Sequence, residues 1–162
     1  MLEMIDCYLS LGSNLGDRRL NLQEGIQLLQ SKGVTIASLS SVYETDPVDI
    51  PYTGPFYNLA LKAKTTLSPE NLLKICIDVE MTLGRIKRDR NKPRTFDADI
   101  IFYSDLIVKK EELVIPHPRM HLRNFVLIPL AEIASAFMHP AFKKTVATLL
   151  KECPDRSAVK KL

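Results

Sequence analysis

The chain is organised around one stretch, Arg94-Thr95-Phe96-Asp97-Ala98-Asp99-Ile100-Ile101-Phe102-Tyr103. From residue 96 onward its side chains alternate between two faces, which predicts a β-strand. One face is expected to carry Phe96, Ala98, Ile100 and Phe102, and the other Asp97, Asp99, Ile101 and Tyr103. Because a strand rises about 3.3 Å per residue, Asp97 and Asp99 would lie roughly 6.6 Å apart. Two carboxylates held that close repel each other unless a cation lies between them, and Mg²⁺ favours such oxygen ligands.

The ten residues 85–94 that lead into this strand are strongly basic, with six Lys or Arg and one acid. Guanidinium groups beside a metal-binding carboxylate pair are typical of phosphoryl transfer, in which positioning and charge stabilisation do most of the catalysis. The alternative is a solvated basic loop before a strand whose acids face water. Since the two features are adjacent, we favour a site, and we expect residues 85–94 to close over a bound triphosphate. Glu80 is either an exposed acid at the end of the preceding helix or a partner of Arg85.

Length and composition indicate a single domain over residues 1–162 of ordinary globular type. The net charge of +3 is too small to indicate a nucleic-acid partner, and no aromatic residues interleave with the basic segment to stack bases. No apolar run reaches membrane-spanning length, and the first residues lack the features of a signal peptide. The three cysteines are odd in number and lack metal-ligand spacing. We therefore expect a cytoplasmic monomer with reduced thiols, which binds small molecules rather than nucleic acid or membranes.

Hydrophobic patterns divide the first two thirds of the chain into four strands and two helices. The strands are expected at residues 5–11, 34–43, 58–66 and 96–103, with a turn at 12–17 and a long loop at 44–55. Asp17 and Ser68 are typical N-caps of the two helices, and Pro69 suits a first helical position. The helices are expected to end near Gly33 and Gly84. The order βαββαβ predicts an α+β sandwich of the ferredoxin-like type, with these helices on one face of the sheet.

Extra C-terminal helices are expected after a turn at His117, which lies between two prolines. One helix is predicted over residues 122–134, with an interruption or bend at Pro129, and a shorter one over residues 145–151. The tail after Pro154 is expected to be loose.

Two residue pairs have competing interpretations when judged by spacing alone. His117 and His121 are four residues apart, but Pro118 lies between them and no glutamate follows His117, so we disfavour a zinc pair. Phe56 and Phe125 stand near conspicuous polar residues, yet an aromatic residue is more often part of a core than of a site. Spacing therefore favours a core position for both phenylalanines.

Several motifs follow one another at characteristic spacings. They are Tyr8-Leu9-Ser10-Leu11-Gly12-Ser13-Asn14-Leu15-Gly16, Val42-Tyr43-Glu44-Thr45-Asp46-Pro47, Phe56-Tyr57-Asn58, Gly84-Arg85, Pro93-Arg94-Thr95-Phe96-Asp97-Ala98-Asp99 and Ile115-Pro116-His117-Pro118-Arg119-Met120. Each motif alone is weak, whereas the ordered set is highly specific. From residue 8 to about residue 134 the chain resembles the 6-hydroxymethyl-7,8-dihydropterin pyrophosphokinases of folate biosynthesis.

The resemblance implies an enzyme, a 2-amino-4-hydroxy-6-hydroxymethyldihydropteridine diphosphokinase, that transfers pyrophosphate from ATP to the pterin hydroxymethyl group and releases AMP. It implies two Mg²⁺ ions held by Asp97 and Asp99. It implies catalytic roles for Arg85, Arg94 and Asp97. Nucleotide binding would fall to Glu80, Arg85, Arg94, Ile100, His117 and Arg123. The pterin would stack between Phe56 and Phe125, and its edge would be read by Asn58 and the backbone of Thr45, Asp46 and Val48.

Asn91, Lys92 and Ala98 differ from the residues that this family usually has at these positions. Their side chains need not touch a substrate, so an active enzyme is still expected. Two rival functions are a metal-dependent phosphohydrolase that uses the same Asp pair and a non-catalytic protein that binds a nucleotide or a pterin.

Overall fold

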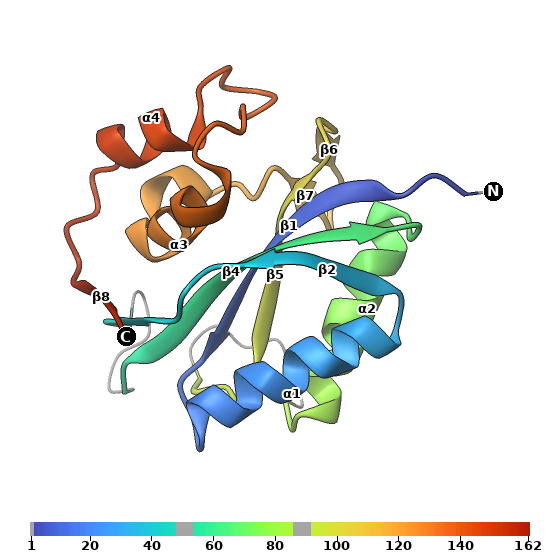
Figure 1. The fold of residues 1–162 in the computed structure, drawn as a ribbon, viewed down its shortest axis with the longest axis vertical. Helices are drawn as coiled ribbons and strands as arrows, with labels where there is room; N and C mark the ends of the chain where they lie inside the picture. Colours follow the sequence, from blue (N-terminus) through green and yellow to red (C-terminus); the bar gives the residue numbers. More distant parts are fainter. Residues whose placement is uncertain (1, 48–53, 86–91) are drawn as a thin grey trace.

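The computed structural model describes residues 2–47, 54–85 and 92–162. Its main sheet contains β1 (Ile5–Ser13), β2 (Val34–Leu39), β3 (Tyr43–Thr45), β4 (Phe56–Thr65), β5 (Asp97–Tyr103) and β8 (Val159–Lys161). All of their pairings are antiparallel. β1 lies between β5 and β4, while β2 and β3 both pair with β4, and β8 pairs with β3 (Figure 1). The α+β class is confirmed, and the order β5-β1-β4-β2 is the ferredoxin-like order of the four predicted strands.

One face of the sheet is covered by α1 (Arg18–Ser31) and α2 (Pro69–Thr82), as predicted (Figure 1). Both helices begin at the predicted caps, because the Asp17 carboxylate accepts from the Leu20 N–H and the Ser68 hydroxyl accepts from the Asn71 N–H. The core on this face includes Leu9, Leu11, Leu22, Leu29, Leu61, Leu72, Cys76 and Val79.

Gly25 lets α1 approach the residue that precedes β5. A Cβ at this position would lie 2.1 Å from the Phe96 ring, which no real side chain tolerates. Phe96 is fully buried there, one residue before Asp97. The close contact between helix and ring therefore fixes the start of the strand that carries the acidic pair.

The opposite face of the sheet is covered by α3 (Asn124–Ala134) and α4 (Val146–Glu152) (Figure 1). Its core includes Tyr8, Ala60, Ile101, Phe102, Val126, Leu127, Leu130, Val146 and Leu149. A 3-10 turn, η1 (Met120–Leu122), precedes α3, and β6 (Val108–Lys109) pairs with β7 (Val114–Ile115) in a separate small sheet. Of the predicted interruption or bend at Pro129, the interruption is wrong, because α3 continues through this residue.

The second predicted strand is divided into β2 and β3, and Ser40 shows why. Its N–H donates to the Ala60 carbonyl, while its side-chain hydroxyl accepts from the Ala60 N–H. A side chain thus takes the place of a backbone acceptor, and the ladder is interrupted between the two strands. The predicted loop from residue 44 is also wrong at its start, since β3 extends to Thr45. Gly12, predicted to be in a turn, lies within β1.

The strict alternation predicted for residues 96–103 is wrong after Ile101. Tyr8 pairs with Phe102 and Leu9 with Ile100, so Ile101 is an extra residue in β5. Such a bulge reverses the faces beyond it. Phe102 consequently joins the core under α3, whereas Tyr103 joins the core under α1 and α2.

The tail after Pro154 is ordered rather than loose. Its last residues form β8 on the free edge of β3, and pattern reasoning missed this because three residues carry no periodic signal. Cys7, Cys76 and Cys153, all within the described residues, are buried and form no disulfide, in keeping with the expected thiols. No helix in the described ranges has both the length and the apolar character that crossing a membrane demands.

Candidate active site

Asp97 and Asp99 extend from the sheet face that α3 covers farther along β5. Asp97 lies opposite Gly12 of β1. Ala98 and Ile100, which alternate with the two acids, are buried in the core beneath α1 and α2. The strand pleat therefore directs both carboxylates to the opposite face. Because the Ile100 side chain is buried in that core, only its backbone remains for the predicted contact with a nucleotide.

Gly12 makes room on this face for Asn58 and Phe56 from β4. A Cβ on Gly12 would lie 2.6 Å from Asn58 Oδ1 and 3.4 Å from Phe56 Cδ1. Both side chains therefore lie over β1, beside the strand of Asp97. Phe56 is buried, yet it belongs to neither core cluster of the described residues. A glycine inside a strand signals such a close approach, so the sequence contained this clue.

Arg85 lies between two carboxylates. Its Nη1 is 3.1 Å from Glu80 Oε2 and 2.7 Å from Asp97 Oδ1. Glu80 is buried, and its other oxygen accepts from the Ala98 N–H at 3.3 Å. The question left open by the sequence is thus answered: Glu80 is a buried partner of Arg85. The Asp97 side chain keeps 22% of its surface exposed, so it is the carboxylate of this group that a ligand reaches.

Arg94 approaches Asp97 from the other side. Its Nη1 is 3.6 Å from Asp97 Oδ2, and its guanidinium carbon is 5.9 Å from the centre of the Phe56 ring. Its Nε and Nη2 both donate to the Lys92 carbonyl at 3.3 Å. The unusual Lys92 therefore orients Arg94 through its backbone, which any residue type supplies. Two arginines and one aromatic ring converge beside a partly exposed carboxylate.

Asn14 holds the backbone of Arg94, a role that the sequence did not reveal. The Asn14 Oδ1 accepts from the Arg94 N–H at 2.7 Å, and the Asn14 N–H donates to the Arg94 carbonyl at 3.0 Å. The two residues are 80 positions apart, so no local pattern predicts this contact. It ties the end of β1 to the entry of β5.

Asn58 and Thr45 form the second polar group on the same face. Asn58 Nδ2 donates to Thr45 Oγ1 at 2.6 Å, and both residues are buried. Asp46, the next predicted pterin contact, is exposed at the end of β3. Val48 lies outside the described residues, as do Asn91 and the other residues of the predicted lid between 86 and 91.

His117, Arg123 and Phe125 enter from the segment around η1 and the start of α3. The His117 N–H donates to the Ile101 carbonyl at 3.1 Å, which fixes it beside β5 two residues beyond Asp99. The Arg123 guanidinium carbon is 5.6 Å from the Phe125 ring centre. Phe125 is half-buried on the rim of the α3 core. Among the described residues, Phe56 and Phe125 do not stack on each other.

The donor set around Asp97 and Asp99 suits a cation that takes only part of its ligands from protein. Over residues 2–47, 54–85 and 92–162, no group of three or more His, Cys, Asp or Glu side chains gathers to hold a metal. Mg²⁺ is commonly held by one or two carboxylates together with phosphates and water, so two acids on one strand face fit it. His121 packs edge-on against Phe142.

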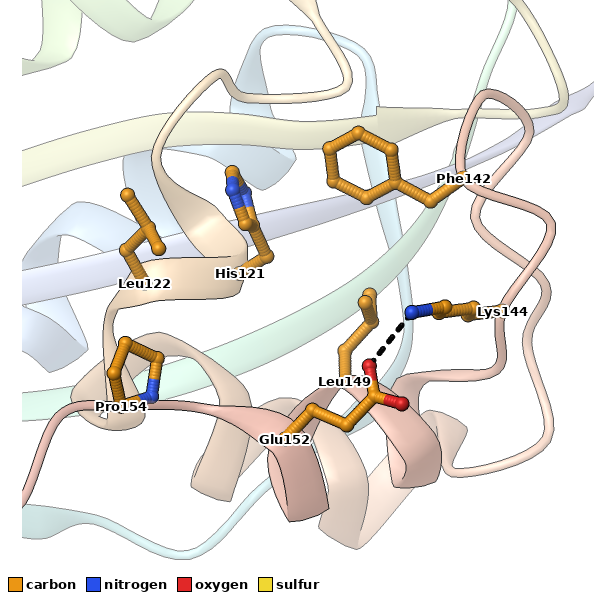
Figure 2. A pocket seen from close by; sticks show the side chains of 7 residues that line it. All are labelled: His121, Leu122, Phe142, Lys144, Leu149, Glu152 and Pro154. Carbon is orange, nitrogen blue, oxygen red and sulfur yellow. Dashed lines mark hydrogen bonds and ion pairs between the residues drawn. The ribbon is translucent and has the colours of Figure 1, made fainter.

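A cavity of about 410 Å³ lies between η1, α4 and the segment that contains Phe142 (Figure 2). Its lining residues are His121, Leu122, Phe142, Lys144, Leu149, Glu152 and Pro154. Lys144 and Glu152 pair with each other across it at 2.8 Å (Figure 2). None of the predicted site residues lines this cavity, so it is separate from the group around Asp97.

The family model and the similar proteins described below point to the same protein family. The family model for 7,8-dihydro-6-hydroxymethylpterin-pyrophosphokinase (HPPK) matches residues 8–135. The chain is 46% identical over 127 residues to a 2-amino-4-hydroxy-6-hydroxymethyldihydropteridine pyrophosphokinase of Bacillus subtilis, covering 78% of this chain and 76% of that protein. It is 42% identical over 148 residues to the folic acid synthesis protein FOL1 of Dictyostelium discoideum, covering 91% of this chain but 22% of that longer protein.

The fold agrees with a solved structure of a distant protein. The wild-type Plasmodium falciparum HPPK-DHPS with pteroate aligns over 93% of this chain and 42% of its own, with a TM-score of 0.75 and 16% identity. At that identity the likeness concerns the fold alone.

Proposed function

The chain belongs to the 7,8-dihydro-6-hydroxymethylpterin-pyrophosphokinase family, whose members use ATP, and from this membership we propose the reaction that it performs. It transfers pyrophosphate from ATP to 6-hydroxymethyl-7,8-dihydropterin and releases AMP, in the synthesis of folate. The observation that carries the proposal is the convergence of Arg85 and Arg94 on Asp97, within the residues that match the family. The active unit is proposed to be one domain and a monomer.

Asp97 and Asp99 would hold Mg²⁺, which when bound supplies positive charge to the bridging phosphate oxygens. The support is their position on one strand face, with the Asp97 carboxylate partly exposed. Two ions are proposed, with the triphosphate supplying the oxygens that the protein does not.

Arg85 and Arg94 bind the phosphates and stabilise the charge that develops as the bond to the leaving group breaks. Both guanidinium groups face Asp97, and both are largely buried. Little reorientation is needed when an anion arrives, which is the advantage of a preorganised charge. His117 and Arg123 are proposed to assist at the phosphates, and Glu80 with the Ile100 backbone to border the nucleotide.

The pterin ring is proposed to lie between Phe56 and Phe125. Asn58 and the backbone of Thr45, Asp46 and Val48 would then read its edge. The support is the position of Asn58 and Phe56 over Gly12, on the face that also carries the acidic pair. An aromatic ligand stacks on such rings with about 1–3 kcal/mol per contact, by analogy with nucleobases.

In the chemical step the pterin hydroxymethyl oxygen attacks the β-phosphorus of ATP in line. The bond between the β-phosphorus and the oxygen that bridges to the α-phosphate breaks, and AMP leaves with that electron pair. The hydroxyl proton passes to Asp97 or to solvent, since a loose transition state needs no strong base.

AMP formation from ATP, Mg²⁺ and 6-hydroxymethyl-7,8-dihydropterin tests the proposal when each component is omitted in turn. AMP is expected only in the complete mixture. Phosphate release without the pterin would support a phosphohydrolase, and ligand binding with no AMP in any mixture would support a non-catalytic binding protein. Either result contradicts the proposed function.

A further inference from the structure

The last eight residues, 155–162, connect two elements that carry proposed pterin contacts. At one end they are bound to the start of α3, where Phe125 lies. At the other end they pair with β3, which contains Thr45. These two elements are far apart in sequence, so their spacing depends on tertiary contacts.

The contact with α3 replaces a missing helix cap. Arg123, the residue before α3, makes no capping hydrogen bond with its side chain. Instead the Asp155 Oδ2 accepts from the Asn124 N–H at 3.1 Å, which satisfies a free donor and places a negative charge at the positive end of the helix. Asn124 Nδ2 in turn donates to the Ser157 carbonyl at 2.8 Å. The helix start is therefore held from both its backbone and its first side chain.

The Asp155 carboxylate is itself fixed in place. Its Oδ1 accepts from the Ser157 N–H at 2.8 Å. Burial opposes ionisation of this carboxyl, but the hydrogen bonds from Ser157 and Asn124 outweigh that effect, so the pKa of Asp155 lies below its usual value. At neutral pH the cap is charged, which is the state in which it suits a helix N-terminus.

The contact with β3 covers a short edge strand. β3 has three residues and pairs with β4 on one side, and β8 supplies its partner on the other, with Tyr43 opposite Lys161 and Thr45 opposite Val159. The Leu162 N–H extends the ladder by donating to the Val42 carbonyl at 3.0 Å. A three-residue edge strand has few bonds of its own, so a second partner contributes strongly to its order.

A direct contact between α3 and the β3 region reinforces this connection. The Glu132 carboxylate of α3 accepts from the Ser41 N–H, the Ser41 hydroxyl and the Tyr43 hydroxyl. The helix is thus held to β3 near its C-terminal end by Glu132, and at its first residue by way of the tail. Two separated attachments fix orientation as well as distance.

We propose that residues 155–162 act as a strap that sets the spacing between Phe125 and Thr45, and that Asp155 is a positioning residue for the pterin. The inference rests on the proposed function. The strap makes no described contact with Arg85, Arg94 or Asp97, but it holds Asn124, which follows Arg123, so its main effect is expected on the pterin and a smaller one on ATP. Loss of the strap raises the KM for the pterin more than the KM for ATP.

The test compares Asp155→Ala, Asp155→Asn and a chain that ends at Pro154 with the wild type. Asp155→Ala is expected to raise the pterin KM and Kd by up to roughly fivefold, the limit set by one lost cap of about 1 kcal/mol if its whole cost is coupled to pterin binding. Asp155→Asn keeps one acceptor oxygen, so its pterin KM should lie between those of the wild type and Asp155→Ala. The control is Glu152→Ala, which removes an exposed carboxylate of α4 that pairs with Lys144 and does not touch Asn124.

Hydrogen exchange at residues 43–45 gives a second readout that does not depend on catalysis. The strap predicts faster exchange there in Asp155→Ala, although Asp155 does not belong to β8. Equal losses for both substrates that follow the melting temperature, or unchanged pterin affinity and unchanged exchange, would overturn the strap. If the shortened chain does not fold, the point variants still decide the matter. A wild-type chain that makes no AMP refutes the proposed function instead. Hydrogen exchange at residues 43–45 then still tests the strap, because it does not depend on catalysis.

Discussion

At the scale of single residues, the site depends on where positive charge meets Asp97. Arg85 contacts one oxygen of this carboxylate and Arg94 lies near the other. Arg85 also contacts the buried Glu80, so losing Asp97 would not leave this arginine without a counter-charge. The residue-scale chemistry can therefore be altered at Asp97 while the surrounding structure is retained.

Asp97→Ala and Asp99→Ala should each lower turnover about 10³-fold or more, because charge stabilisation at the phosphates is worth several kcal/mol. The fold should survive in both, since Glu80 still neutralises Arg85. Steady-state AMP formation and thermal melting measure the two effects. Near wild-type activity of either variant at saturating Mg²⁺ would refute its assignment as a metal ligand.

Gly12→Ala tests whether Asn58 lies over β1 for a functional reason. The new Cβ would lie 2.6 Å from Asn58 Oδ1, so Asn58 must move away from its contact with Thr45. We expect at least a tenfold rise in the pterin KM with little change in the KM for ATP. Gly54→Ala is the matched control, because a Cβ there meets no described atom within 4 Å. A larger loss for ATP than for the pterin would contradict the proposed arrangement.

At the scale of secondary structure, periodicity predicted the features that depend on residues close together in sequence. The strands, both capped helices and the α+β order follow from such patterns, and the structure agrees with them. The bulge at Ile101 depends on how β5 pairs with Tyr8 and Leu9 of β1. The break after β2 depends on the hydrogen bond from Ala60 of β4 to the Ser40 side chain. The contact between Asn14 and Arg94 spans 80 positions, so it was likewise invisible to local patterns.

The attachment of α3 to β3 through Glu132 should make stability depend on pH. Burial opposes ionisation of Glu132, but hydrogen bonds from Tyr43 and Ser41, with the charge of Lys161, lower the pKa of this carboxyl below its usual 4.5. A carboxyl with a lowered folded-state pKa stabilises the fold above its unfolded value, and this stabilisation is lost as pH falls through the folded value.

Glu132→Gln should therefore lower the urea midpoint of unfolding at pH 7. The difference in midpoint between this variant and the wild type should shrink as pH falls below about 4.5. Equilibrium unfolding by circular dichroism at several pH values measures this. A difference that stays constant from pH 7 to pH 3 would show that ionised Glu132 does not hold α3 to β3.

At the scale of the whole molecule, one face of the sheet serves the core and the other also carries the candidate site. α1 and α2 cover one face, whereas α3 and α4 cover part of the other and leave there the ends of β1, β4 and β5 that carry the candidate site (Figure 1). The residues of this candidate site are a prediction that rests on family resemblance. The sequence did not predict that the last strand would connect to it, because three residues in a polar tail carry no pattern of their own.

Pyrophosphate is proposed to move as one unit from ATP to the pterin. Product analysis by ³¹P NMR and mass spectrometry, on one reaction with ATP, Mg²⁺ and 6-hydroxymethyl-7,8-dihydropterin, tests this transfer most directly. AMP and the pterin diphosphate are expected in equal amounts. Formation of ADP with a pterin monophosphate, or of AMP with free pyrophosphate and unchanged pterin, would contradict it.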